Sequence, residues 1–206
     1  MFFKRQSAQS HIILIVGLGN IGPQYEATRH NIGFRVVDSL SETASWQTQD
    51  RCQALVQKIN LANQEIILAK PTTMMNDSGR AVSRLAQYYK IAPENIWIVH
   101  DELDLPLGRI RIATESGHNG HNGIISIQTD LGHNRFWRFR IGINARQHRE
   151  IPGQAYVLQD FTPAEQLLVT ESVDQAASAI KAALTNGLAG AMKRYNKAVV
   201  KNDSQG

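Results

Sequence analysis

Residues 12–22 of the chain read IILIVGLGNIG, an apolar run that ends in a glycine-rich turn. Because Ile12–Val16 is apolar at every position, we predict a strand buried on both faces, as in the middle of a parallel sheet. Ile96–Val99 is a second run of this kind. Further short apolar or alternating runs predict strands at Ala54–Ile59, Ile66–Ala69, Arg109–Ile112 and Phe136–Ile143.

Helical patterns lie between these predicted strands. Phe34, Val37 and Leu40 recur at a spacing of three residues, and Ala81 and Leu85 begin a similar pattern. Apolar residues at this spacing form one face of a helix. Strands that alternate with helices predict an α/β sandwich with a largely parallel or mixed sheet.

The longest predicted helix lies near the C-terminus. Thr162 is a good N-cap, Pro163 follows it in the first turn, and Glu165 completes the pattern of a capping box. We expect this helix to continue to about Leu184 and to be broken by Asn186-Gly187.

The composition is that of an ordinary globular protein. The 206 residues are 42% hydrophobic and 19% charged, with a net charge of +4. No repeat or linker-like segment divides the chain, so we expect one domain over residues 11–200. We expect residues 1–10 to be a flexible extension and residues 201–206 to be a tail. The single cysteine, Cys52, excludes an internal disulfide framework and is expected to be a packed thiol.

Two observations predict a cytoplasmic protein. Lys4 and Arg5 precede the apolar run Ile12–Val16, but that run is too short for a signal peptide and no small-residue cleavage pattern follows it. No stretch approaches the roughly 18 apolar residues that a membrane span needs. We therefore expect no membrane association.

The glycine-rich turn at residues 17–22 matches the pattern G-x-G-x-x-G, which also occurs in dinucleotide-binding proteins. The surrounding residues disagree with that interpretation. Pro23 follows the third glycine, residues 24–29 have no apolar stripe, and Asp38 lies inside a helical pattern. A sharp turn at the edge of a central strand, where open α/β sheets bind ligands, is the favoured interpretation.

Four polar segments follow predicted strands or precede predicted helices. Because loops after successive parallel strands meet at one edge of a sheet, we expect these segments to line one cleft. They are TRHNIG (residues 28–33), KPTTMMNDSG (70–79), VHDELD (99–104) and GHNGHNG (117–123).

This set of side chains suits the hydrolysis of an ester by an activated water. His30 would take a proton from the water, which needs a base with a pKa near neutrality. Asp101 would accept a hydrogen bond from the other ring nitrogen, and carboxamides with backbone N–H groups would hold the oxyanion. A metal site at His118, His121 and Asp101 is a weaker alternative. A serine nucleophile is disfavoured because the chain has no G-x-S-x-G elbow.

These motifs, in this order, resemble those of the bacterial-type peptidyl-tRNA hydrolases. The resemblance extends from Ile15 to about Glu165. It rests on IVGLGNIGPQYEATRHNIGF, KPTTMMNDSG, VHDELDLPLG and GHNG, with weaker similarity in RFRIGI and YVLQDFTPAE. The resemblance implies a single α/β domain with a twisted mixed sheet. It also implies a monomer that needs no metal or other cofactor and cleaves the ester between a peptide and the 3′ ribose of tRNA.

The resemblance also implies roles for individual residues. His30 corresponds to the catalytic base and Asp101 to the residue that orients it. The remaining implied substrate-binding residues are Asn20, Tyr25, Met75, Asn76, His121 and Asn122. Among these, Asn20 and Asn76 would hold the peptide and the scissile region. Asn122 would position the water or the 3′ end of the tRNA, and His121 would shape the side that faces the tRNA.

Basic residues predict where tRNA phosphates bind. Arg138 and Arg140 match a basic pair of the family, and Arg109 and Arg111 alternate on a predicted strand. All four are expected to contact the acceptor stem.

The chain departs from the family pattern at three positions. Ile21 replaces a proline, Met74 replaces an aromatic residue, and Ile125 replaces a lysine. Two other interpretations stay open at this point. One is a tRNA- or RNA-binding protein without catalytic activity, and the other is a nucleotide-dependent oxidoreductase.

Overall fold

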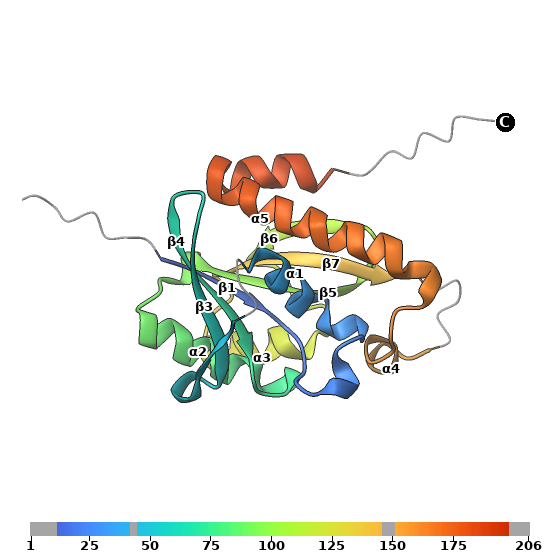
Figure 1. Ribbon diagram of the computed structural model, residues 1–206, viewed down its shortest axis with the longest axis horizontal. Helices are drawn as coiled ribbons and strands as arrows, with labels where there is room; N and C mark the ends of the chain where they lie inside the picture. Colours follow the sequence, from blue (N-terminus) through green and yellow to red (C-terminus); the bar gives the residue numbers. More distant parts are fainter. Residues whose placement is uncertain (1–11, 42–44, 146–150, 198–206) are drawn as a thin grey trace, which may run out of the picture.

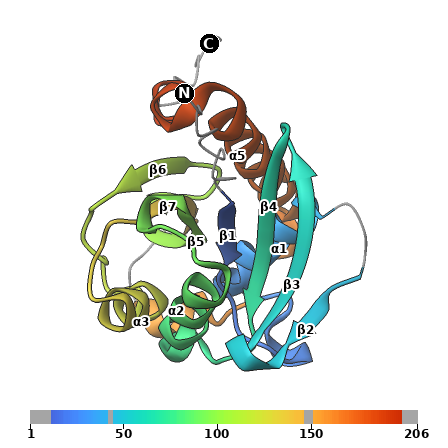
Figure 2. The same cartoon turned by 90° about the vertical axis from the view of Figure 1, so that its left-hand side faces the viewer.

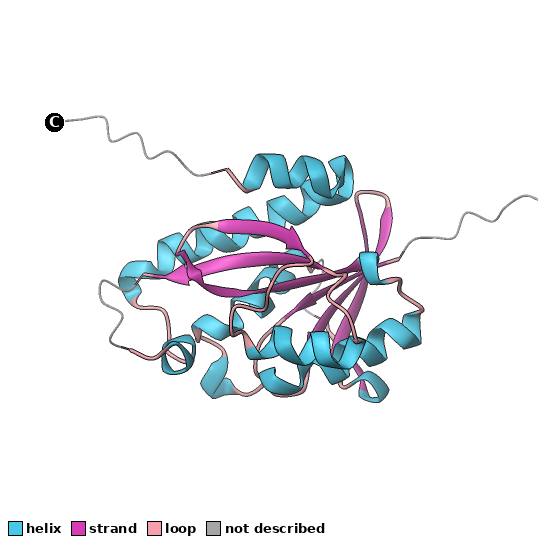
Figure 3. Cartoon of the chain, turned by 180° about the vertical axis from the view of Figure 1, so that it is seen from behind, coloured by secondary structure: helices cyan, strands magenta, loops and turns pink. Residues whose placement is uncertain are grey.

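The structure is a computed structural model, which describes residues 12–41, 45–145 and 151–197. A mixed, twisted sheet of seven strands crosses the middle of the molecule in the order β2-β3-β4-β1-β5-β7-β6 (Figures 1 and 3). The strands are β1 (Ile13–Gly17), β2 (Gln47–Gln49), β3 (Ala54–Leu61), β4 (Gln64–Pro71), β5 (Ile96–Pro106), β6 (Ile110–Thr114) and β7 (Trp137–Asn144).

The centre of the sheet is parallel and its two sides are antiparallel. β1 pairs in parallel with β4 and with β5, and β5 pairs in parallel with β7. The hairpin β3-β4, the short strand β2 and the edge strand β6 add antiparallel pairs. The predicted single-domain sandwich with a mixed, largely parallel central sheet is therefore confirmed.

Helices cover both faces of the sheet (Figure 2). One face carries α1 (Ile32–Leu40) and α5 (Gln166–Tyr195), and the other carries α2 (Ser78–Tyr89) and α3 (Asn122–Leu131). Because β1 is central, its alternate side chains enter two separate cores. Ile13 and Ile15 pack with α1 and α5, whereas Leu14 and Val16 pack with α2 and α3. This explains why the strand is apolar at every position.

The turn after β1 does not open a helix. Short 3-10 turns occupy Pro23–Tyr25 and Arg29–Asn31, and α1 begins only at Ile32. A dinucleotide fold needs a helix that starts within the glycine turn, so that interpretation is not supported. Asp38 lies in α1, as expected, and is paired with Lys70 at 2.6 Å.

A close approach of two glycines fixes where α1 meets the sheet. A Cβ atom on Gly33 would lie 2.4 Å from the carbonyl oxygen of Val99, and one on Gly17 would lie 2.3 Å from that of Gly33. No real side chain tolerates such distances, so both positions require glycine. The end of β1, the start of α1 and the middle of β5 are thereby held in direct contact.

The C-terminal helix begins and breaks where the sequence predicts. Thr162 and Glu165 form the capping box, and Gly187 has non-helical dihedral angles (φ 77°, ψ 157°) inside α5. The helix continues beyond this break to Tyr195. Directly after it, the side-chain amide of Asn196 accepts from the N–H of Ile112 and donates to its C=O, at 2.7 and 2.8 Å.

Three features of the fold were not predicted. β2 is short and polar, β5 continues for several residues beyond Val99, and a helix of five residues, α4 (Gly153–Val157), follows the sheet. The expected strand at residues 109–112 begins at Ile110, so Arg109 lies just before it. Cys52 is buried, as expected.

Some expectations fall on other parts of the chain. The predicted extension (residues 1–10) and tail (residues 201–206) lie outside the described residues, as do the limits of the predicted domain at 11 and 200. Within the described ranges, none of the helices combines the length and the apolar character that crossing a membrane requires.

The close approach at Gly33 can be tested by Gly33→Ala. The added methyl group must push α1 away from β5, and such overpacking costs about 1–3 kcal/mol of the free energy of unfolding. We expect a lower midpoint in urea unfolding followed by circular dichroism. Gly190→Ala is the control, because Gly190 lies in α5 with its nearest neighbour atom at 3.5 Å. Equal midpoints for the two variants would contradict the close-approach constraint.

Candidate active site

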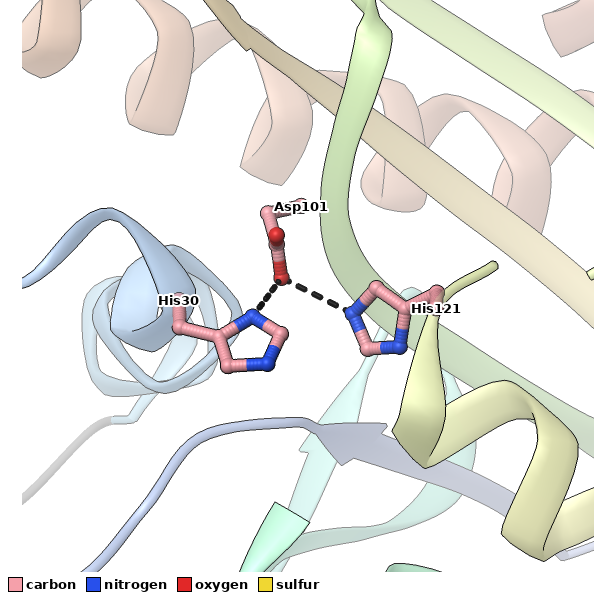
Figure 4. Close-up of side chains that lie close together, drawn as sticks. All are labelled: His30, Asp101 and His121. Carbon is pink, nitrogen blue, oxygen red and sulfur yellow. Dashed lines mark hydrogen bonds and ion pairs between the residues drawn. The ribbon is translucent and has the colours of Figure 1, made fainter. Parts of the chain in front are cut away.

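Three segments that are distant in sequence bring two imidazoles to one carboxylate (Figure 4). His30 comes from the 3-10 turn before α1, Asp101 from β5, and His121 from the N-cap of α3. The same carboxylate oxygen, Asp101 Oδ1, lies 2.8 Å from His30 Nδ1 and 2.9 Å from His121 Nε2. Asp101 is only 1% exposed, so both hydrogen bonds are shielded from bulk water.

The hydrogen bonds determine the tautomer of each ring. The backbone N–H groups of Gly123 and Ile124 donate to His121 Nδ1, at 3.1 and 3.3 Å. A neutral His121 therefore carries its proton on Nε2 and donates it to Asp101. In the same way, Nδ1 of His30 donates to the carboxylate, so the lone pair of a neutral His30 is on Nε2. His30 is thereby prepared to act as a base through Nε2.

The charges of the site oppose the effect of burial. Burial alone would raise the pKa of Asp101, but the positive charges of His30 and His121 and their hydrogen bonds hold it well below its usual range. Burial lowers the pKa of His30, and the charge and hydrogen bond of Asp101 outweigh this, so the pKa is raised above its usual value. Asp101 is therefore a permanent anion that stabilises a protonated His30.

A fourth side chain, His100, lies behind this group. Its ring packs edge-on against His121 at 4.7 Å between centroids, and its Nδ1 donates to the carbonyl of Asp101 at 2.7 Å. Burial and the neighbouring His121 lower the pKa of His100 well below its usual value. His100 is thus a neutral ring at physiological pH.

Asn20 is oriented by two neighbouring loops. Its Oδ1 accepts from the N–H of Met75 at 2.8 Å. The side chain of Asn31 accepts from the backbone N–H of Asn20 and donates to its C=O, at 2.8 and 2.9 Å. With its oxygen occupied, the carboxamide of Asn20 has its Nδ2 left to donate to a bound substrate. Asn31 was not predicted, although it directly follows His30 in the quoted motif.

These residues border a cleft of about 600 Å³. Every predicted catalytic and substrate-binding residue lines it: Asn20, Tyr25, His30, Met75, Asn76, Asp101, His121 and Asn122. The four segments that were expected to converge therefore do so. The lining residues that were not predicted are Met74, Glu102, Leu103, Asn119 and Gly120 together with Gly153, Gln154, Val157 and Leu158.

The last group forms a wall made by α4 and the residue after it. Arg29, next to His30, connects this wall to the catalytic turn. Its guanidinium lies over the rings of Tyr156 and Phe161 and pairs with Glu165 at 2.9 Å. The weaker similarity in YVLQDFTPAE was the one sequence signal for this segment, and it did not indicate that the segment reaches the cleft.

Two of the four arginines that were expected to contact tRNA lie inside the protein. Arg138 and Arg140 are buried, and Arg140 is paired with Glu102 through two hydrogen bonds of 2.8 and 2.6 Å. The guanidinium of Arg138 is held inside the protein, whereas Arg140 keeps a small exposed fraction of 7%. Arg111 is exposed on β6, and Arg109 is half-buried with its Nη1 donating to the carbonyl of Lys197.

One group among the described residues has the ligand types and the spacing that a metal ion needs. His30, Asp101 and His121 offer atoms that lie within 4.8 Å of one another. Both ring nitrogens that face Asp101 donate hydrogen bonds to it, so a metal ion at this point would have to replace these two protons. His118, the other proposed ligand, is exposed, and its Nδ1 accepts from the N–H of Gly120.

Comparisons with known proteins identify the family of this chain. Residues 14–203 match the family model described as peptidyl-tRNA hydrolase. The chain is 43% identical to the peptidyl-tRNA hydrolase of Mycolicibacterium smegmatis, over 85% of this chain and 93% of that protein. It is likewise 43% identical to that of Mycobacterium tuberculosis H37Rv, over 89% and 97% of the two chains.

A solved structure shows the same fold. The crystal structure of the peptidyl-tRNA hydrolase from Acinetobacter baumannii superposes with a TM-score of 0.83 at 38% identity, covering 92% of this chain and 97% of that one. The family match and these relatives span nearly the whole described chain, the cleft included. The chain therefore belongs to the peptidyl-tRNA hydrolase family.

Proposed function

We propose that this protein hydrolyses the ester bond between a peptide, or an N-blocked amino acid, and the 3′ ribose of tRNA. The observation that carries the proposal is the pairing of His30 with the buried Asp101 at the edge of the cleft, 2.8 Å between Nδ1 and Oδ1. The family match supports the substrate class. The biological role that follows is the recycling of peptidyl-tRNA released from stalled ribosomes.

In this mechanism His30 Nε2 takes a proton from a water molecule as the oxygen of that water attacks the ester carbonyl. The proton gives His30 a positive charge next to the anion Asp101, which stabilises it. General-base catalysis of this kind supplies about 10²–10⁴ in rate. The proton then passes from His30 to the departing 3′ oxygen of the ribose, so the base is restored and the carboxylic acid leaves with the water's oxygen.

Carboxamides around the cleft would hold the substrate without adding charge. Asn20, oriented by the N–H of Met75, donates to the peptide or the developing oxyanion. Asn76 holds the scissile region, and Asn122 holds the attacking water or the 3′ end of the tRNA. Tyr25 and Met75 form part of the wall that contacts the peptide.

The proposed tRNA contacts are on β6 and at the residue directly before it. Arg111 and the half-buried Arg109 are the two predicted arginines that a phosphate of the acceptor stem can approach. We propose further that the protein acts as a monomer in the cytoplasm and needs no cofactor. Sedimentation of the protein with and without tRNA tests whether it is a monomer.

His30→Ala tests the base. We expect the variant to fold normally and its turnover of an N-blocked aminoacyl-tRNA to fall by about 10²–10⁴, because the water loses its proton acceptor. The assay is run with and without chelator. His133→Ala is the matched control, a half-buried histidine just after α3 that does not line the cleft. Near-normal turnover in His30→Ala would sink the assignment, and loss of wild-type cleavage on chelation would point to a metal.

The pH dependence tests the role of Asp101. His30 must be neutral to act, and its pKa is raised, so kcat/KM should fall on acidification at a pH above the 6.5 of an ordinary histidine. Asp101→Asn removes the charge that raises this pKa. The acidic limb of the profile should therefore move to lower pH while the maximal rate falls. A limb that stays in place would show that Asp101 does not set the pKa of the base.

Arg111→Ala tests the tRNA contact. If Arg111 binds a phosphate, the variant should bind tRNA more weakly at low salt. The slope of log K against log salt concentration should then decrease by about 1. Fluorescence titrations of labelled tRNA across a salt series measure both quantities. An unchanged slope would rule out a phosphate contact at this position.

A further inference from the structure

A buried polar layer lies on the sheet face that carries α2 and α3. His100 and Glu102 on β5 and Arg138 and Arg140 on β7 all belong to it. The strands are in register here, with His100 opposite Arg140. All four side chains are buried, although buried charges are costly unless they are paired. The hydrogen-bond partners of these side chains therefore show which neighbouring segments the layer holds in place.

Arg138 is paired with backbone carbonyls and not with a carboxylate. Its Nη1 donates to the carbonyl of Gly117 at 2.7 Å, and its Nη2 donates to that of Ser116 at 2.5 Å. The residue is 1% exposed. Burial and the neighbouring charge of Arg140 lower the pKa of Arg138 to about 10, so it is still a cation at neutral pH. Two charge-assisted hydrogen bonds from one planar group fix the direction of the peptide chain.

The carbonyls that Arg138 holds begin the segment 116–121, here called the histidine loop. Its middle residues turn sharply, since Asn119 and Gly120 both have positive φ angles, 48° and 75°. Its last residue is His121, which donates to Asp101 and packs against His100. A shift of the loop's first residues would therefore move the second donor away from the catalytic carboxylate.

We infer that Arg138 is a positioning residue for the hydrolysis, because it anchors the histidine loop so that His121 shares the carboxylate of Asp101 with His30. The inference rests on the proposed function for its effect on rate. It replaces a phosphate contact as the role of this arginine, since a side chain with 1% exposure cannot reach the tRNA backbone.

Because His30 and His121 share one carboxylate oxygen, displacement of His121 should change the pKa of His30, which a general loss of stability would not do. Asp101 and His121 are the charged or titratable groups that face His30 in the site, and His100 lies behind His121. If His121 moves away, Asp101 Oδ1 accepts from His30 alone. Its bond to His30 then strengthens, so the pKa of His30 should rise further.

The test compares Arg138→Met, Arg138→Lys and a control, Arg51→Ala, which removes one exposed positive charge away from the cleft. The titration of the His30 ring is followed by NMR without substrate. Turnover and tRNA affinity across a salt series are measured in parallel. We expect Arg138→Met to raise the pKa of His30 and to reduce kcat about tenfold to 100-fold, as misplaced catalytic groups do. Its salt slope should match that of wild type.

Arg138→Lys keeps the charge but cannot present two coplanar donors to two carbonyls. We expect a smaller pKa rise, a smaller loss of kcat and faster hydrogen exchange of the N–H of Gly120 and His121 than in wild type. If Arg138→Met fails to fold, the measurements on Arg138→Lys decide whether Arg138 anchors the histidine loop. Unchanged exchange and an unchanged His30 titration in Arg138→Lys would then overturn the inference.

The remaining outcomes are also decisive. A normal kcat and His30 titration in folded Arg138→Met would overturn the anchoring role. A reduced salt slope with normal kcat would overturn it as well, and would show a phosphate contact. Wild-type protein that does not cleave the substrate would refute the proposed function. The NMR titration would still decide whether Arg138 positions His121.

Discussion

A single carboxylate oxygen, Oδ1 of Asp101, accepts hydrogen bonds from two imidazoles, and the geometry of the cleft follows from this. An anion that is 1% exposed would be very unfavourable without partners, so the fold must deliver both donors to it. His30 arrives from the turn after β1 and His121 from the start of α3. The shared acceptor thus ties three segments that are distant in sequence to one point and leaves Nε2 of His30 as the reactive atom.

The backbone around this point explains how the donors reach it. The glycine pair Gly17 and Gly33 lets α1 begin almost against β5, which places His30 beside Asp101. On the opposite face, buried arginines of β7 donate to backbone carbonyls of the histidine loop and to the carboxylate of Glu102 on β5. The close packing of the two glycines on one face of the sheet and the hydrogen bonds of the two arginines on the other face therefore shape the same site.

Much of this site could be predicted from the sequence, because parallel strands bring the segments after them to one edge. His30, Asp101, Asn20 and Asn76 follow predicted strands whose apolar runs are unmistakable, so their convergence required no knowledge of distances. Asn122 follows the antiparallel strand β6, so this rule does not account for its position. The wall formed by α4 could not be found in this way, since a helix of five residues has no measurable periodicity. Arg138 and Arg140 were misplaced for another reason. A strand that alternates Arg with Phe is typical of a half-exposed surface, and the burial of these arginines depends on Glu102 and on the carbonyls of Ser116 and Gly117, which are distant in sequence.

The amide of Asn196 has a consequence for the behaviour of the protein in solution. β6 is an edge strand, and a free edge offers its backbone groups to a strand of another molecule. Here both backbone groups of Ile112, in the middle of that strand, are already bonded to one side chain that follows α5. An incoming strand would have to displace the end of this helix before it could add to the sheet. The residue that follows the C-terminal helix thus protects the β6 edge of the sheet from strand addition, one of the routes by which crowded chains aggregate.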